Sequence, residues 1–175
     1  SDDNGNGICD YTEGGAITDG CDLPVNSDGH GYIHLTDNGK VLYKSSQSIS
    51  GFQFYVTGST ATDDIIDISG GAAGTNNFMM IYQFSTQNTL NIVSWNMVGG
   101  TIPPGCGTLM EITFADSFTP TSLDGLIFAG LADPMPLELY FAYYDDTGIV
   151  RGCTDQSACN FDAIATEDDG SCLYN

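Results

Sequence analysis

The amino-acid sequence predicts an all-β sandwich, and three observations support this fold class. Residues 31–146 contain short apolar runs separated by Gly, Pro, Asn and Asp, a spacing that is typical of strands joined by turns. Several of these runs alternate apolar and polar residues, as half-buried strands do. No segment has the period of an amphipathic helix, and the 22 glycines disfavour long helices. We therefore expect about nine short strands in two packed sheets.

Three segments show the alternation most clearly. Their apolar positions are Phe52, Phe54 and Val56; Met110, Ile112 and Phe114; and Leu137, Leu139, Phe141 and Tyr143. Further strands are predicted over residues 32–35, 41–43, 65–68, 78–84, 90–97 and 126–129. The glycine-rich segment 69–74 lacks the lysine and the following helix of a phosphate-binding loop, so we expect a tight crossing between strands there. Trp95 is expected to pack on a strand face, in the core or half-buried.

The charge balance is strongly acidic and limits the classes of partner. Asp and Glu total 23 against three basic residues, which gives a net charge of −20. Nucleic acid and anionic lipid surfaces would be repelled, and no apolar run approaches the length of a membrane span. The acidic residues are clustered, which favours bound calcium, because each Ca²⁺ cancels two charges where repulsion is greatest. The alternative is a solvated acidic surface that keeps the protein soluble.

The N-terminal segment contains a full match to the calcium loop of EF-hands, D-x-[DN]-x-[DN]-G-x₅-E. Gly7 allows the sharp turn that brings oxygens from alternate residues to one ion. Helices do not flank the loop, since 14-GGAITDG-20 is a poor helix former, and the alternative is a turn-rich tail without metal. A second patch, 26-NSDGHG-31, is more typical of a plain turn than of another ion site. The predicted ligands are Asp2, Asn4, Asn6, the Ile8 carbonyl, Asp10 and Glu13.

The six cysteines indicate disulfides formed in an oxidising, extracellular environment. They are Cys9, Cys21, Cys106, Cys153, Cys159 and Cys172. Zinc is disfavoured, because no C-x-x-C pair is present and the two histidines, His30 and His34, are not spaced to complete a ligand set. Six cysteines permit many pairings, so the sequence leaves the connectivity open. A bond between Cys9 and Cys21 would pin the calcium loop in place of the missing helices.

The C-terminal segment 152-GCTDQSACNFDAIATEDDGSC-172 combines clustered oxygen ligands with three cysteines. We expect a small disulfide-bonded unit with a second calcium site. An odd number of cysteines leaves one that reaches outside the motif, either to Cys106 or to a neighbouring subunit. The predicted ligands are Asp155, Asn160, Asp162, Asp168 and Asp169.

These motifs resemble known families. The C-terminal segment is similar to a repeat of secreted surface proteins from marine Bacteroidota and large algal viruses, and the N-terminal loop resembles dockerin-like and thrombospondin-type calcium repeats. Segments 49–58, 69–74 and 102–114 resemble cohesin-like domains. The resemblance implies a nine-stranded jelly-roll sandwich that binds dockerins, so that one subunit's loop could dock on the next subunit's sandwich in a head-to-tail polymer.

Together these features divide the chain into a calcium-loop segment (1–30), a cohesin-like sandwich (31–146) and a Cys/Asp-rich motif (147–175). We expect a trimmed or mature piece of a longer precursor, secreted and located outside the cell or on a cell or virion surface. The expected function is that of a structural or adhesive module that associates with itself or with other surface proteins.

The sequence is also compatible with two other functions. A carbohydrate-binding module would use calcium and the stacking faces of its aromatic residues, for which the candidates are Tyr140, Tyr143, Tyr144 and Trp95. A glycoside hydrolase needs two paired carboxylates, and the strand candidates are Glu111 and Glu138. The chain has two histidines and no Ser-His-Asp pattern, so we expect no enzyme.

Overall fold

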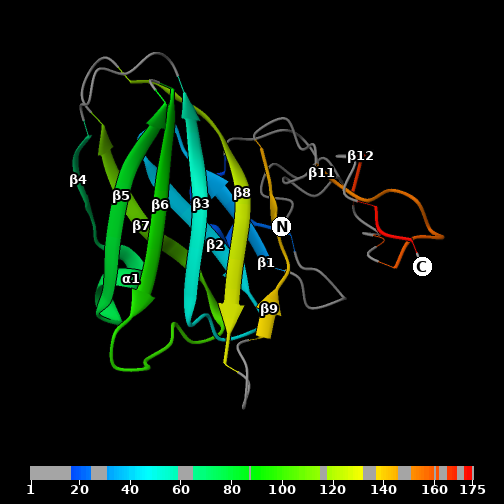
Figure 1. Cartoon of the computed structure of the whole chain (residues 1–175), viewed down its shortest axis with the longest axis horizontal. Coiled ribbons are helices and arrows are strands. Elements are labelled where there is room, and N and C mark those ends of the chain that lie inside the picture. The colour runs from blue at the N-terminus through cyan, green and yellow to red at the C-terminus, as the bar shows by residue number, and fades with distance from the viewer. Residues whose placement is uncertain are drawn as a thin grey trace, which may run out of the picture.

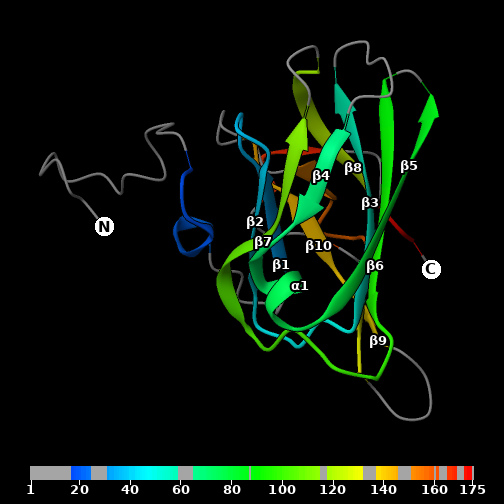
Figure 2. The same ribbon diagram turned by 90° about the vertical axis from the view of Figure 1, so that its left-hand side faces the viewer.

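The period-two segments form strands, and ten of these strands build two five-stranded sheets packed face to face (Figures 1 and 2). The computed structural model describes residues 17–24, 31–58, 65–86, 88–114, 118–131, 137–145, 151–159, 161, 165–168 and 172–174. The all-β class predicted from the sequence is confirmed. Among the described residues, no helix is long and apolar enough to cross a membrane.

The first sheet, called here the β2 sheet after its central strand, has the order β10-β1-β2-β7-β4. Its strands pair antiparallel except for β1 and β10, which are parallel. Between β2 and β7 the register skips Leu109, and this bulge allows both Leu109 and Met110 to be buried. The strands are β1 (Gly31–Leu35), β2 (Lys40–Ser45), β4 (Ile65–Ser69), β7 (Gly105–Phe114) and β10 (Phe141–Tyr143).

The second sheet, the β3 sheet, has the order β5-β6-β3-β8-β9 and is antiparallel throughout. A bulge lies opposite Phe54, where Gly125 adopts φ 58° and the ring of Tyr55 occupies the space that a Cβ on Gly125 would need. The strands are β3 (Gly51–Gly58), β5 (Phe78–Thr86), β6 (Thr89–Asn96), β8 (Pro120–Gly130) and β9 (Leu137–Leu139).

Aromatic side chains fill the space between the sheets. The Phe52 ring lies 5.7 Å from that of Phe54 and 5.6 Å from that of Phe128, measured between centroids. Phe128 in turn stacks on Phe141 from the opposite sheet. The alternation predicted for β3 is confirmed, since Phe52, Phe54 and Val56 are buried. Burial of side chains of this size stabilises the fold by about 1.5–3 kcal/mol each.

Two sequence predictions are corrected. The segment 137–145 was expected to be one strand, but the chain passes from the β3 sheet to the β2 sheet at Tyr140. The alternation continues across this change, because Leu139 and Phe141 both pack on the same core. The crossing expected at 69–74 contains a short helix, α1 (Gly71–Thr75), which begins after Gly70 at φ 69° and buries Ala73.

Residues 17–24 cover the outer face of the β2 sheet (Figure 2). They form a 3-10 turn, η2 (Gly20–Asp22), in which the side chain of Asp19 accepts a hydrogen bond from the Cys21 backbone N–H at 2.8 Å. A Cβ on Gly20 would overlap with the backbone oxygens of Gly107 and Tyr43, so only glycine fits this approach. The second buried cluster, between this segment and the sheet, contains Ile17, Leu23, Tyr32, Leu42 and Tyr144.

A disulfide and a lysine hold this N-terminal clamp, defined as residues 17–24. Cys21 is bonded to Cys106 at the start of β7, so the expected Cys9–Cys21 bond is wrong. Lys44 on β2 donates hydrogen bonds from Nζ to the carbonyl oxygens of Cys21 and Leu23, at 2.8 and 2.6 Å. The clamp is therefore attached to two neighbouring strands of the sheet.

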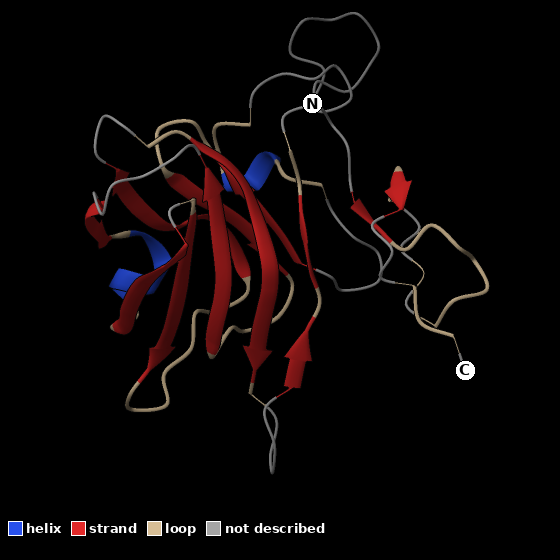
Figure 3. Ribbon diagram, turned by 45° about the horizontal axis from the view of Figure 1, so that its top comes forward, coloured by secondary structure: helices blue, strands red, loops and turns tan. Residues whose placement is uncertain are grey.

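The C-terminal motif forms a small unit beside the sandwich (Figure 3), with the two-residue strands β11 (Arg151–Gly152) and β12 (Glu167–Asp168) paired in parallel. Cys153 is bonded to Cys172 within the motif. The expected link from this motif to Cys106 is therefore wrong, because Cys106 belongs to the clamp. Cys159 carries a free, exposed thiol. Cys9 lies outside the described residues.

Candidate functional site

The outer face of the β3 sheet carries a band of exposed apolar side chains. Strand alternation directs one set of residues into the core and the other set outward. The register aligns two outward rows from β5 to β8, Met79–Trp95–Gly51–Ala129 and Ile81–Val93–Gln53–Ile127. The exposed fraction of the side chain is 40% for Met79, 47% for Ile81, 36% for Trp95 and 56% for Ile127. We call the residues Met79, Ile81, Val93, Trp95 and Ile127 the apolar band.

Neither of these two rows contains a charged residue between β5 and β8, and a polar row borders them. That third row includes Tyr55 and Asp124. The Asp124 carboxylate accepts hydrogen bonds from the hydroxyls of Thr57 at 3.1 Å and Ser122 at 2.9 Å. An apolar centre with a hydrogen-bonded polar border is the arrangement found in protein–protein interfaces.

The two outer faces of the sandwich differ. The N-terminal clamp covers the β2 sheet with Ile17 and Leu23, whereas the side chains of the apolar band are exposed. No described helix or strand lies over the front of the β3 sheet in Figure 1. Beyond Trp95 the turn after β6 adds Met97 and Val98, which are also exposed. Exposed apolar patches on a folded protein are candidates for interaction sites.

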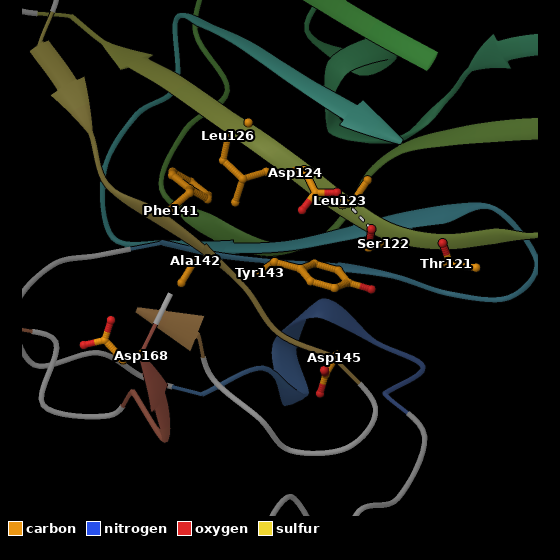
Figure 4. Close-up of a pocket in the computed structure, with 11 residues that line it drawn as sticks. Thr121, Ser122, Leu123, Asp124, Leu126, Phe141, Ala142, Tyr143, Asp145 and Asp168 are labelled. Carbon is orange, nitrogen blue, oxygen red and sulfur yellow. Dashed lines mark hydrogen bonds between the residues drawn. The ribbon is translucent and has the colours of Figure 1, made fainter. Parts of the chain in front are cut away.

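A polar cavity of about 740 Å³ lies at the sandwich edge between β8 and β10 (Figure 4). Its lining includes three carboxylates, Asp124, Asp145 and Asp168, together with Tyr143. Asp168 comes from the C-terminal unit, where it accepts hydrogen bonds from the backbone N–H and hydroxyl of Thr154 at 3.4 and 3.1 Å. The cavity is therefore built jointly by the sandwich and the C-terminal motif.

Of the ligands predicted for the C-terminal calcium site, the structure describes Asp155 and Asp168. The Asp155 carboxylate accepts hydrogen bonds from the backbone N–H and hydroxyl of Ser157, at 2.8 and 2.7 Å, and from the Tyr174 hydroxyl at 2.8 Å. These bonds hold the pKa of Asp155 below its usual 3.8, the backbone N–H of Ser157 contributing most.

The remaining predicted ligands lie outside the described residues. This holds for the second patch at 26–31 except Gly31, which begins β1. Within the described ranges no three His, Cys, Asp or Glu side chains form a group that could hold a metal ion. The predicted ligands outside those ranges are Asp2, Asn4, Asn6, Ile8, Asp10, Glu13, Asn160, Asp162 and Asp169.

The other candidate residues are dispersed. Tyr144 is buried, Tyr143 stacks on His34 at 6.4 Å between ring centroids, and Trp95 belongs to the opposite sheet, so these rings do not form one stacking face with the exposed Tyr140. The two strand carboxylates are also on different sheets, Glu111 on β7 and Glu138 on β9.

The sequence did contain a signal for the apolar band. The run 78-FMMIY-82 is apolar at consecutive positions, whereas a strand with one solvated face alternates. Half of that run faces the core, and the other half supplies Met79 and Ile81 to the outer surface.

No protein-family model matches this sequence, and a search of curated proteins finds no match. Two similar solved structures are cohesins. A non-cellulosomal cohesin from the archaeon Archaeoglobus fulgidus has 13% identity, with a TM-score of 0.45 over 66% of this chain and 88% of that one. The seventh ScaB type I cohesin from Pseudobacteroides cellulosolvens has 12% identity, with a TM-score of 0.46 over 65% of this chain and 87% of that one.

Proposed function

We propose that this chain is an extracellular assembly module that binds a protein partner through the apolar band, and that the partner is the N-terminal segment of another copy. The observation that carries the proposal is the contrast between the two outer faces. One is covered by residues 17–24 of the chain itself, and the other exposes Ile81, Trp95 and Ile127 together. Removal of this remaining apolar surface from water favours an interface.

Charge favours calcium in this contact. The segment Asp2–Glu13 is acidic and matches a calcium loop, while the apolar band offers no charge to pair with it. A bound Ca²⁺ would neutralise carboxylates of the segment, so that its apolar residues Ile8 and Tyr11 could dock on the band. A loop that docks on a different surface of the next copy gives an open, head-to-tail chain of subunits.

An extracellular setting is supported by the two disulfides, Cys21–Cys106 and Cys153–Cys172, since such bonds persist in oxidising environments. The net charge of −20 keeps separate copies apart until specific contacts form. These properties fit a structural or adhesive subunit at a cell or virion surface.

The test is light scattering of the full chain in calcium as protein concentration is raised. We expect open-ended growth, with average mass rising steadily, and dissociation in chelator. Ile127→Asp places a charge in the apolar band and should abolish growth, as should Glu13→Gln in the loop. The matched control is Leu173→Asp, at an exposed apolar residue of the C-terminal unit, which should grow like the unmodified chain. Unchanged growth of Ile127→Asp would overturn the proposal.

The alternative function is a calcium-dependent carbohydrate- or protein-binding module that uses the cavity between β8 and β10. The observation that favours it is that one polar cavity is lined by Asp124, Asp145 and Asp168 together with the ring of Tyr143. Among the described residues these carboxylates do not form a group that could hold a metal ion, so calcium would have to act from the loop predicted at Asp2–Glu13. Because only Tyr143 of the predicted stacking residues lines that cavity, we place assembly through the apolar band first.

A further inference from the structure

Strand β5 is a long edge of the β3 sheet that no described strand covers. It pairs with β6 on one side, and it ends the strand order on the other (Figure 1). Alternate backbone N–H and C=O groups of an edge strand point away from the sheet and remain available for another strand. Ile81 and Tyr82 are 47% and 42% exposed although they lie on opposite faces of the strand, which shows how open this edge is.

This edge lacks most of the features by which proteins prevent strands from pairing between molecules, although the register with β6 shifts near its end, between Phe84 and Thr86. Such edges are usually short, or they carry lysine, proline or an inward-pointing charge. Strand β5 spans nine residues, FMMIYQFST, with no proline and no charge. The other sheet edges are shorter, since β9 and β10 have three residues each and β4 has five, including Asp67.

The charge distribution favours contact between copies at this edge. Residues 68–110, which contain α1, β5 and β6, include no Asp, Glu, Lys or Arg, although the whole chain has a net charge of −20. Two copies that meet along β5 therefore bring together no charged side chain of α1, β5 or β6. The edge is thus an uncharged contact region on an acidic molecule.

We propose that two copies of the chain pair through β5 in antiparallel orientation, which joins their β3 sheets into one continuous sheet. A second β5 is the partner that fits, because among the described strands it alone offers an uncovered edge of the same length. Antiparallel pairing of identical strands is self-complementary and closes as a two-fold dimer. The register with the greatest overlap, Phe78–Thr86 on itself, places Tyr82 opposite Tyr82 and Ile81 opposite Gln83.

This pairing goes beyond the proposed function and is independent of it. Docking on the apolar band uses outward side chains and gives open-ended growth, whereas edge pairing uses backbone groups of β5 and stops at two copies. The Ile127→Asp variant, which should lose growth, should still form the β5 dimer, because Ile127 is on β8, and β6 and β3 separate it from β5.

Disulfide trapping tests the register directly. In the full chain with Cys9→Ser and Cys159→Ser, Tyr82→Cys places one thiol beside its symmetry mate, and opposed residues of paired strands are close enough for a disulfide. We expect a covalent dimer on mild oxidation, seen on a non-reducing gel. The matched control, Ile127→Cys in the same background, should give several-fold less, because the two-fold axis does not pass near β8.

Amide hydrogen exchange provides the second measurement and needs no new cysteine. At dimer-forming concentration every second amide of Phe78–Thr86 should become protected relative to dilute protein, and Tyr82→Lys should remove that protection while the amides of β3 stay protected. Equal crosslinking of Ile127→Cys and Tyr82→Cys, or β5 amides that exchange alike at all concentrations, would overturn the pairing.

Discussion

At the residue scale, the hydrogen bonds around Asp155 define its protonation and the order of the C-terminal turn. Its carboxylate accepts three hydrogen bonds, two from Ser157 and one from Tyr174. All three bonds favour the ionised form of Asp155 and so lower its pKa. The bond to the Asp155 carboxylate favours the protonated hydroxyl of Tyr174, so the pKa of Tyr174 is raised above 10.0. The same oxygens would be needed for calcium, so an ion here would compete with these donors.

We predict that Ser157→Ala raises the pKa of Asp155 part of the way toward 3.8. The substitution removes the hydroxyl donor and leaves the backbone N–H, the larger cause of the shift. Because the folded pKa is depressed, the stability from these bonds is present above pH 3.8 and is lost as pH falls through the folded value. Carboxyl-carbon NMR titration measures the pKa. A value equal to that of the unmodified chain would show that the hydroxyl bond has no effect in solution.

Several residue-level features were accessible from the sequence, and others were not. The alternation at Phe52, Phe54 and Val56 predicted a buried face correctly, since period two requires only local information. Trp95 was expected to be in the core or half-buried, and this is wrong, because its parity on β6 directs it outward and leaves it exposed. Which parity faces the core depends on both neighbouring strands, β5 and β3, which local pattern does not contain.

At the scale of elements, the pairing of Cys21 with Cys106 determines what covers the β2 sheet. The cysteines are 85 residues apart, so nothing in their spacing indicated the bond. A bond to the nearer partner, Cys9, would close a shorter loop, but the 3-10 turn at Gly20 fits closely against Gly107 and Tyr43. Tertiary contact therefore selected the pairing. The split of 137–145 at Tyr140 was also missed, because no glycine or proline marks the point where the chain changes sheets.

We predict that the double substitution Cys21→Ser and Cys106→Ser lowers the free energy of unfolding of the sandwich by about 2–5 kcal/mol. Loss of the crosslink frees the unfolded chain and loosens the clamp, which exposes Leu42 and Tyr32 beneath it. Denaturant unfolding gives the energy, and hydrogen exchange of β1 and β2 shows the exposure.

The control for the clamp is the matched pair Cys153→Ser and Cys172→Ser, which removes the other disulfide. Its loop spans 19 residues in the C-terminal unit, so it should leave exchange in β1 and β2 unchanged. Equal protection of these strands in both double variants would contradict the assigned role of the clamp.

At the scale of the whole molecule, the acidic residues are separated along the chain from an uncharged segment, residues 68–110. The 23 acidic residues lie outside residues 68–110, and the calcium proposal concerns the two acidic ends. The sequence indicated the acidic clusters and the fold class. It did not indicate that β5 ends a sheet, because strand order depends on pairings across the whole chain.

We predict that calcium raises the melting temperature relative to chelator at the same ionic strength. An ion that binds only the folded chain stabilises it by about 2.7 kcal/mol at about one hundred times its Kd. At about 2–4 °C per kcal/mol, the expected rise is about 5–10 °C. Differential scanning calorimetry measures it, with Glu13→Gln to locate the ion. The same melting temperature in calcium and in chelator would mean that the acidic clusters are surface charge only.

The parallel pairing of β1 with β10 sets the order in which the molecule can be completed. Gly31 aligns with Phe141, so β1, the first described strand of the sandwich, cannot complete its pairing until β10, the last strand of the sandwich, is present. A chain emerging from a ribosome or a secretion channel therefore exposes the unfilled edge of β1 until more than a hundred further residues have followed. Pairings between such distant segments form slowly. The sandwich can therefore close only after β10 has been synthesised, and the bond between Cys21 and Cys106 can then form in an oxidising environment.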